Sequence, residues 1–194
     1  MPRRGLDGPA VIEAAARIAD IEGLEAVSVA HVAGDLGIRA PSLYNHVAGL
    51  DGLRRGIAVR ALGELADAMR TAAVGRAGTD ALAALARTYR AYALAHPGCY
   101  TATQWVAAGA DEEHARAAEA AVGVVLSVLR AWRFEEDEAI HATRAIRSAL
   151  HGFVTIEQAG GFALAVDLDQ SFEWLVARLG DGLTASAPGP DRST

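Results

Sequence analysis

The sequence predicts an all-α protein of about nine helices, and three observations lead to this prediction. Alanine, the best helix former, is by far the commonest residue. Only 6% of the residues are aromatic, whereas strands favour aromatic and β-branched side chains. Apolar residues also recur three and four positions apart through most of the chain, which places them on one face of a helix.

The first third of the chain divides into three short helices. Gly8-Pro9 suits the first turn of a helix that ends near Gly23. Ser28 is a suitable N-cap for a second helix, which Gly37 ends. A third helix is expected at about 39–47, with its proline tolerated only in the first turn. Two short helices joined by a glycine turn predict a helix-turn-helix domain.

The remainder of the chain predicts a larger helical bundle. Its helices are expected at about 50–74, 79–96 with Thr79 as cap, 100–108, 111–132 and 137–159, with a last helix that Asp167 begins. Asp167 and Gln170 together resemble a capping box. We therefore divide the chain into a helix-turn-helix domain at 1–49, a larger helical domain at 50–184 and a disordered tail at 185–194.

Charge and composition limit the classes of function. The net charge is −6, so a general affinity for nucleic acid is not expected. Residues 1–60 hold equal numbers of arginines and acidic residues, so any contact with DNA is expected in this first third. Cys99 is the only cysteine, which favours an intracellular protein. Without an apolar run long enough for a signal peptide or a membrane span, we expect a cytoplasmic protein with no membrane contact.

The stretch GIRAPSLYNHV, residues 37–47, carries the functional argument. A helix this short does not persist alone in water, so its apolar side chains must hold it on the preceding helices. These side chains are Ile38, Leu43 and Val47. On the other face, Tyr44 and His46 can donate to phosphate oxygens, and Asn45 can bond a base edge or a phosphate. We interpret the stretch as a helix that enters the DNA major groove, with a solvated face on a plain helical hairpin as the alternative.

Residues 27–47, VSVAHVAGDLGIRAPSLYNHV, closely resemble the DNA-binding region of the TetR family of bacterial transcriptional regulators. The matching features are Ser28, Leu36-Gly37-Ile38, Pro41-Ser42-Leu43-Tyr44 and His46. The resemblance covers about the first 65 residues and implies contacts with double-stranded operator DNA. The expected DNA-binding residues are Ser28, Arg39, Ala40, Pro41, Ser42, Tyr44, Asn45 and His46. Arg39 is included because it opens the helix. Leu50 stands where the family usually has a lysine, so affinity is expected to depend more on Arg39, Arg54 and Arg55.

The rest of the chain is similar to the regulatory half of one TetR-like subgroup. The subgroup has a Trp-His-Gly signature, and this sequence has Leu150-His151-Gly152 in its place. The resemblance implies a pocket for a largely apolar small-molecule effector. The candidate pocket residues are Tyr89, Tyr92, Trp105, Arg147 and His151. Ordinary packing with satisfied polar groups is the alternative for each of them.

The same resemblance implies a homodimer formed by the last two helices. The expected interface residues are Phe153, Ile156, Phe172, Leu175, Val176 and Leu179. Two-fold symmetry would present two recognition helices to a pseudo-palindromic operator. We therefore expect a regulator, most often a repressor, that an effector releases from its operator by shifting the population of conformations.

Two other interpretations stay open. DEEH at 111–114 and EAIH at 138–141 each place a carboxylate and a histidine three residues apart, as in a metal-binding helical enzyme or carrier. That interpretation needs further inward glutamates, and acids at a helix start also suit the helix dipole. A DNA-binding protein that responds to no ligand is the second alternative. Since no nucleotide loop or nucleophile motif is present, we expect no enzyme activity, no cofactor and no bound metal.

Overall fold

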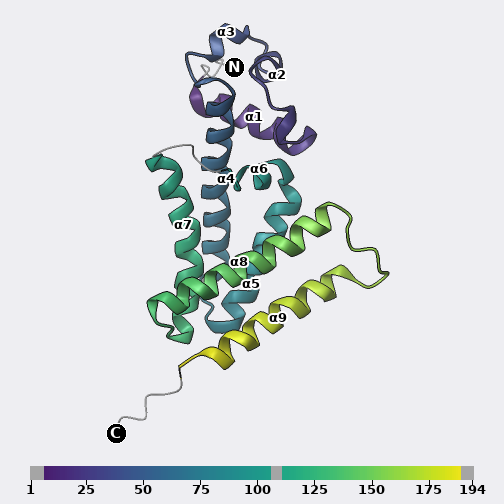
Figure 1. The fold of residues 1–194 in the computed structure, drawn as a ribbon. Helices are drawn as coiled ribbons and strands as arrows, with labels where there is room; N and C mark the ends of the chain where they lie inside the picture. The colour runs from purple at the N-terminus through teal and green to yellow at the C-terminus, as the bar shows by residue number, and fades with distance from the viewer. Residues whose placement is uncertain (1–6, 106–110, 189–194) are drawn as a thin grey trace. The chain divides into compact units, whose positions relative to one another are not determined.

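The computed structural model describes residues 7–105 and 111–188, and every regular element within them is helical (Figure 1). The predicted all-α fold is confirmed, with nine α-helices in the described residues. The chain forms two compact units. The first comprises residues 1–64 and 95–118, and the second comprises residues 65–94 and 119–194. The predicted boundary at residue 49 falls inside the first unit, and the functional division of the chain stays a prediction.

The first unit begins with α1 (Gly8–Glu22), whose two ends are fixed by local chemistry. The Asp7 carboxylate accepts a hydrogen bond of 2.9 Å from the backbone N–H of Ala10. Pro9 lies in the first turn, where its missing N–H has no partner in the helix anyway. Gly23 ends the helix with a φ of 93°, a conformation that favours glycine. The predicted start and end of this helix are confirmed, and Asp7 is an additional cap.

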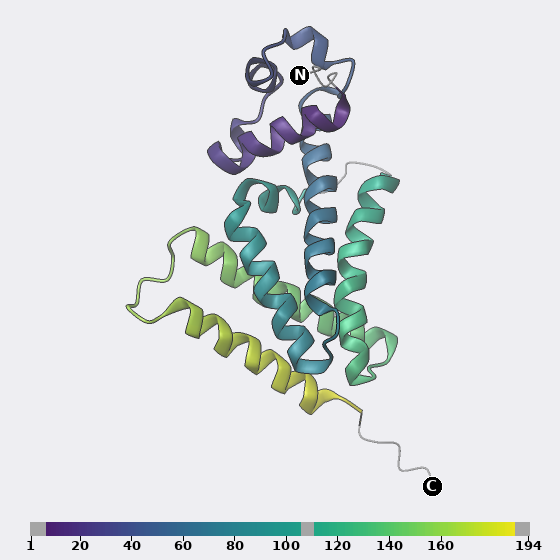
Figure 2. The same cartoon turned by 180° about the vertical axis from the view of Figure 1, so that it is seen from behind.

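Two glycines allow α1 to pack closely against α4 (Gly49–Ala73) and α6 (Pro97–Ala102). A Cβ atom at Gly98 would lie 2.0 Å from the backbone oxygen of Ala19, and one at Gly56 would lie 2.2 Å from the side chain of Ile12. Figure 2 shows α1 and α6 side by side. A side chain at Gly98 would force two backbones apart, since carbonyl groups cannot turn aside as a flexible side chain can.

Cys99 lies at this contact between α1 and α6. Its backbone N–H donates to the Asp20 carboxylate at 2.8 Å, and its thiol donates to the Ala16 carbonyl oxygen at 3.8 Å. The side chain is buried, and burial raises the pKa of the thiol to about 12. Cys99 is therefore a small packing residue with no reactive thiolate near neutral pH.

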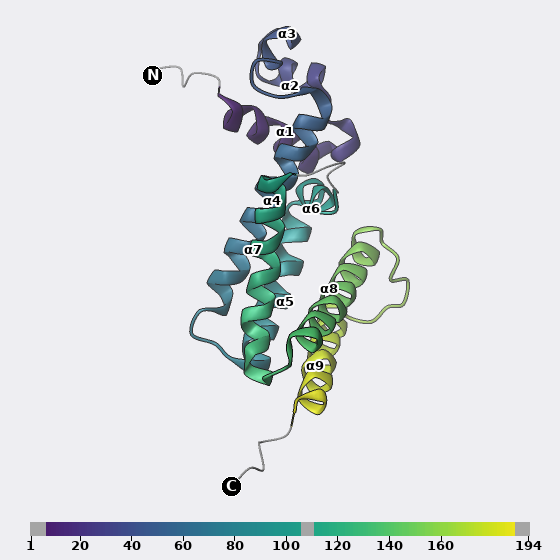
Figure 3. The same cartoon turned by 60° about the vertical axis from the view of Figure 1, so that its left-hand side comes forward.

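The second unit contains α5 (Gly78–Ala95), most of α7 (Glu112–Leu129), α8 (Glu136–Gln158) and α9 (Leu168–Ser186). Figure 3 shows α8 and α9 side by side. A capping box of Glu135 and Glu138 begins α8. The Asp167 carboxylate accepts a hydrogen bond of 2.9 Å from the N–H of Gln170, so the predicted cap of α9 is confirmed.

Several predicted helix boundaries were wrong by a few residues. Helix α5 begins at Gly78, so Thr79 is not its cap, and α6 begins at Pro97 because proline suits a first helical position. Helix α7 ends at Leu129 and continues as a 3₁₀ turn, Arg130–Trp132. Helix α9 extends to Ser186, into the predicted tail. The last residues of that tail, and the predicted end of the helix at 100–108, lie outside the described residues.

Arg90 on α5 lies inside the second unit, with 13% of its side chain exposed. It donates to the two carboxylate oxygens of Glu157 at 2.5 and 2.8 Å and to Asp169 at 2.8 Å. Its guanidinium carbon is 5.6 Å from the ring centre of Phe153 and 4.9 Å from that of Phe172. The hydrogen bond to Glu157 is the main reason why the pKa of Arg90 is raised. Arg90 therefore fixes α8 and α9 on α5.

Candidate nucleic-acid interface

The turn between α2 (Val29–Asp35) and α3 (Ala40–Leu43) is fixed by short-range contacts. The Ser28 hydroxyl accepts a hydrogen bond of 3.1 Å from the N–H of His31, which confirms the predicted cap of α2. Gly37 has a φ of 66°, and the N–H of Ile38 donates to the Ala33 carbonyl oxygen at 3.0 Å. The second helix therefore ends at the glycine turn that the sequence predicts.

Helix α3 is shorter than the predicted 39–47, and this prediction was wrong. The regular helix ends at Leu43, whose carbonyl oxygen accepts hydrogen bonds of 2.9 and 3.0 Å from the N–H groups of His46 and Val47. Leu43 is fully buried and is the one buried side chain of α3. Pro41 offers no N–H, so a single apolar anchor and few backbone bonds hold the helix, and the chain continues as a turn.

Most of the predicted DNA-binding residues form one exposed segment, which we call the recognition surface. It consists of Arg39, Pro41, Ser42, Tyr44, Asn45 and His46. Tyr44 is the most unusual member, since 62% of this large ring is exposed. Ser28 and Ala40 are half-buried. The side chains of Tyr44, Asn45 and His46 are exposed to solvent, and the buried Leu43 holds the segment in place. They are therefore available for contact with another polar surface.

Arg39 differs from the other arginines of the first unit in its pairing. Within residues 7–105 and 111–118, its guanidinium forms no ion pair and no hydrogen bond. The first unit's other arginines within residues 7–64, 95–105 and 111–118 are all paired with carboxylates: Arg17 with Asp35, Arg54 with Glu25, Arg55 with Asp111 and Glu113, Arg60 with Glu64 and Arg116 with Glu112. Arg39 alone among them keeps its charge and donors available for a phosphate or a guanine edge.

Arg55 connects α4 to the start of α7. Its Nε and Nη2 atoms donate to the two oxygens of Asp111 at 2.6 and 2.8 Å, and Nη2 also donates to Glu113 at 2.8 Å. Asp111 accepts a further hydrogen bond of 3.0 Å from the N–H of His114. The Arg55 guanidinium, and then that N–H, hold the pKa of Asp111 well below its usual range. Arg55 is thus paired with two carboxylates, and the phosphate contact expected of it stays a prediction.

The residues predicted to form an effector pocket lie in both units. Tyr89 and Tyr92 are buried on α5, while on α8 His151 is half-buried and Arg147 is exposed. Trp105 belongs to the first unit and meets the His114 ring edge-on, with 5.1 Å between ring centres. Their joint role as a pocket stays a prediction.

The residues predicted for the dimer interface divide by exposure. Phe172 and Val176 are only 1% and 4% exposed and pack in the core of their own unit, and their place at a dimer interface stays a prediction. Phe153, Leu175 and Leu179 are half-buried, and Ile156 is 44% exposed. Trp174, which the sequence pattern did not single out, is 67% exposed on α9. Helical periodicity identifies an apolar face, but it does not tell whether that face covers the same chain or a second copy.

The carboxylates of the two motifs considered for metal binding have other partners. Asp111 and Glu113 bind Arg55, and Glu138 accepts a hydrogen bond of 3.3 Å from the N–H of Glu135. Within the described residues, no group of three or more histidine, cysteine or acidic side chains is placed to hold a metal ion. The acids at these helix starts serve caps and ion pairs.

An exposed polar surface on a helix-turn-helix, in a chain whose other unit is a separate helical bundle, defines a class of protein: the DNA-binding transcriptional regulators. Comparisons with known proteins agree. The family described as "Tetracyclin repressor-like, C-terminal domain" matches residues 82–179. The helix-turn-helix-type transcriptional regulator Rv0681 of Mycobacterium tuberculosis is 35% identical over 179 residues, which cover 92% of this chain and 82% of that protein. The chain belongs to the TetR family of transcriptional regulators.

Solved structures show the same fold. BioQ with its double-stranded DNA operator has a TM-score of 0.70 at 22% identity, covering 93% of this chain and 99% of that one. A TetR variant from Acinetobacter baumannii AYE in complex with minocycline has a TM-score of 0.73 at 20% identity, covering 95% and 99%. The Trp-His-Gly subgroup is not confirmed by these comparisons. None of the described helices is both long and apolar enough to cross a membrane.

Proposed function

We propose that this regulator binds a pseudo-palindromic operator as a homodimer, represses transcription there and is released by a small-molecule effector. The observation that carries the DNA-binding part is the recognition surface, where Arg39, Tyr44, Asn45 and His46 are exposed beside the buried Leu43. The likeness to BioQ, whose structure includes its operator, supports it. A cytoplasmic location is part of this proposal, since the protein must meet its operator DNA.

The side chains of this surface have different proposed roles. Tyr44 and His46 donate to phosphate oxygens, and Asn45 reads a base edge. Arg39 bonds a guanine edge or a phosphate. Ala40, Pro41 and Ser42 are small enough for close approach to the groove. Ser28 contacts a phosphate while it caps α2, because a hydroxyl can accept from the backbone and donate to an oxygen at once.

Tyr44→Ala tests the DNA-binding proposal. Loss of the ring removes a phosphate donor from an exposed position, so affinity for the operator should fall about tenfold while the fold is retained. Fluorescence anisotropy with DNA flanking the protein's own gene, at two salt concentrations, measures this affinity. Ile21→Ala is the matched control, since Ile21 is a 74% exposed apolar side chain of the same unit on α1. Equal operator affinity of the two variants would count against the assignment.

For the homodimer we propose that a second copy covers an apolar patch on α8, α9 and the loop between them. The patch consists of Ile156, Phe162, Leu164, Val166 and Trp174. Leu164, Val166 and Trp174 are 83%, 63% and 67% exposed, an unusual concentration of large apolar side chains in solvent. Tryptophan is also enriched among the central residues that contribute most to binding at an interface.

Trp174→Glu tests this interface. The new carboxylate should abolish self-association, because an unpaired charge cannot be buried between two protomers without a large cost. The indole is 67% exposed in the single protomer, so the variant should fold normally. Val74→Glu, at a 72% exposed position outside the patch, should leave the dimer intact. Light scattering distinguishes the two, and a persistent Trp174→Glu dimer would disprove the proposed interface.

For effector release we propose that Tyr89, Tyr92, Trp105, Arg147 and His151 contact a largely apolar ligand. The minocycline complex of the Acinetobacter protein supports a small-molecule site in this fold. A compound that releases the wild-type protein from its operator, and fails to release a Tyr92→Leu variant with normal operator affinity, would establish the site. A ligand-independent repressor is the alternative outcome, shown by operator affinity that no compound alters.

A further inference from the structure

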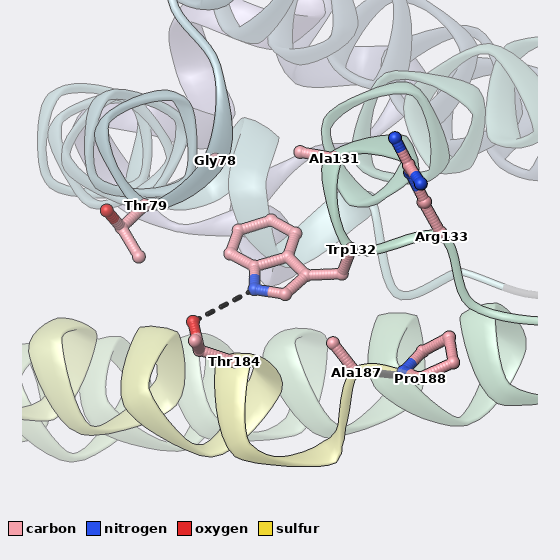
Figure 4. A pocket seen from close by; sticks show the side chains of 8 residues that line it. All are labelled: Gly78, Thr79, Ala131, Trp132, Arg133, Thr184, Ala187 and Pro188. Carbon is pink, nitrogen blue, oxygen red and sulfur yellow. Dashed lines mark hydrogen bonds between the residues drawn. The ribbon is translucent and has the colours of Figure 1, made fainter. Parts of the chain in front are cut away.

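The second unit contains an open pocket at the meeting point of three segments. They are the start of α5 with Gly78 and Thr79, the turn Ala131–Arg133 after α7, and the end of α9 with Thr184 (Figure 4). Its volume is about 540 Å³, within the range of small-molecule sites. It shares no residue with the effector pocket proposed above. We propose that this pocket binds a small organic anion, a flat aromatic carboxylate in particular, independently of DNA.

The indole of Trp132 is held in a fixed orientation at this pocket. Its Nε1–H donates to the Thr184 hydroxyl at 3.1 Å, and that hydroxyl donates to the Gly180 carbonyl oxygen at 2.8 Å. Both donors are therefore used within the protein, and Figure 4 shows the ring between α5 and α9. Only 7% of Trp132 is exposed, so what the indole offers to a ligand is a small apolar area, next to small lining side chains. The thin edge of a flat ring can occupy such an area.

Arg133 supplies the charge at the pocket. Its φ of 55° lies in the left-handed region, and no other non-glycine residue of the described chain has a positive φ. An arginine in this conformation is strained, and glycine would relieve the strain. Strained residues of this kind are concentrated at ligand sites. The geometry thus places a cation where the backbone alone would favour glycine.

The guanidinium of Arg133 is also unpaired. Within the described residues it is exposed and forms no ion pair or hydrogen bond, although Glu135, Glu136, Asp137 and Glu138 follow closely in the chain. None of these four acids lines the pocket, and Glu135 and Glu138 are used in the capping box of α8. The single formal charge in the pocket lining is therefore positive. A carboxylate can accept two parallel hydrogen bonds from it.

2-Naphthoate is a suitable probe, because its flat rings can contact the exposed part of the indole and its carboxylate can bind Arg133. A ligand of this size in an open pocket is expected to bind with a Kd of about 1 mM or below. The whole protein would be labelled with 5-fluorotryptophan and titrated by ¹⁹F NMR, with the three tryptophan signals assigned by single Trp→Phe variants. The Trp132 signal should shift and saturate, while the signals of Trp105 and Trp174 stay in place.

Two comparisons test the charge. The neutral analogue 2-naphthamide should bind the wild-type protein at least about fivefold more weakly than 2-naphthoate. Arg133→Gly, which relieves the strained φ and so should fold normally, should lose about the same factor for 2-naphthoate and bind both probes equally. Arg178→Gln, at an exposed arginine on α9 outside the pocket lining, should bind like wild type. An unmoved Trp132 signal, or wild-type affinity in Arg133→Gly, would overturn the proposal.

Discussion

Two arginines, one in each unit, show how differently this molecule uses the same side chain. Arg90 in the second unit is 13% exposed, binds Glu157 and Asp169, and lies near two phenylalanine rings. Arg39 in the first unit is exposed and, within the described residues, has no partner for its charge. Every donor that Arg90 uses is directed at its own chain, whereas every donor of Arg39 is free for a molecule outside it.

Whether an arginine is paired within its own chain tells a structural residue from a DNA-binding one better than its residue type does. All the basic residues of this chain are arginine, so their identity alone does not locate a site. An arginine that is mostly covered and bidentate, as Arg90 is, fixes helices, and its loss should lower stability. An exposed, unpaired arginine within a helix-turn-helix, as Arg39 is, contributes little to stability, and its loss should lower affinity for DNA.

Arg90→Met should have the largest effect on stability. It removes the cation and leaves the carboxylate of Glu157, only 12% exposed, without its partner. We expect a loss of about 3 kcal/mol in the free energy of unfolding, as is typical when one member of a buried pair is removed. Urea denaturation followed by circular dichroism measures this value. The double variant Arg90→Met/Glu157→Leu should recover much of the loss, since two apolar side chains need no charge compensation. If Arg90→Met were as stable as wild type, the ion pairs of Arg90 would contribute nothing measurable to the free energy of unfolding.

Arg39→Ala should have the opposite profile. Its unfolding free energy should change by less than about 0.5 kcal/mol, because the side chain is exposed and unpaired. Operator affinity should fall about tenfold, and the dependence of log Kd on log salt should weaken by about one ion if the contact is to a phosphate. Arg116→Ala is the control, because Arg116 is a 69% exposed arginine of the same unit that pairs with Glu112 at 3.5 Å. Equal affinities for these two variants would contradict the comparison.

The sequence predicted what depends on short stretches of chain. Ser28 and Asp167 could be recognised as caps, because a cap acts on an N–H only two or three residues away. The exposed members of the recognition surface followed from polar residues around one apolar anchor, Leu43. The end of α3 was predicted too late, since the number of hydrogen bonds and apolar contacts that extend a helix depends on tertiary packing.

The long-range pairs could not be predicted in the same way. Arg90 and Glu157 are 67 residues apart in the chain, and Arg55 and Asp111 are 56 apart. Many arginines and acids are available, so their pairing is known only once the helices are placed. For the same reason the sequence pattern did not show that Phe172 is buried in its own unit, while Trp174, two residues away, is exposed.

Asp111→Asn should have the smallest effect, and it depends on pH. Arg55 lowers the pKa of Asp111, so the pair stabilises the folded state above the ordinary carboxyl pKa of about 4 and loses this contribution as the pH falls further. Asparagine can still accept the N–H of His114, so the variant removes the charge while it retains the cap. The stability of the variant should be lower than that of wild type at pH 7, and the two stabilities should converge towards pH 2.

Thermal denaturation across this range, with the exposed Glu112→Gln as control, measures the effect. A constant difference at every pH would show that the contact between Arg55 and Asp111 acts through packing rather than charge. Arg55 would then stabilise the fold by packing, as Arg90 does against its phenylalanine rings, and not by its charge.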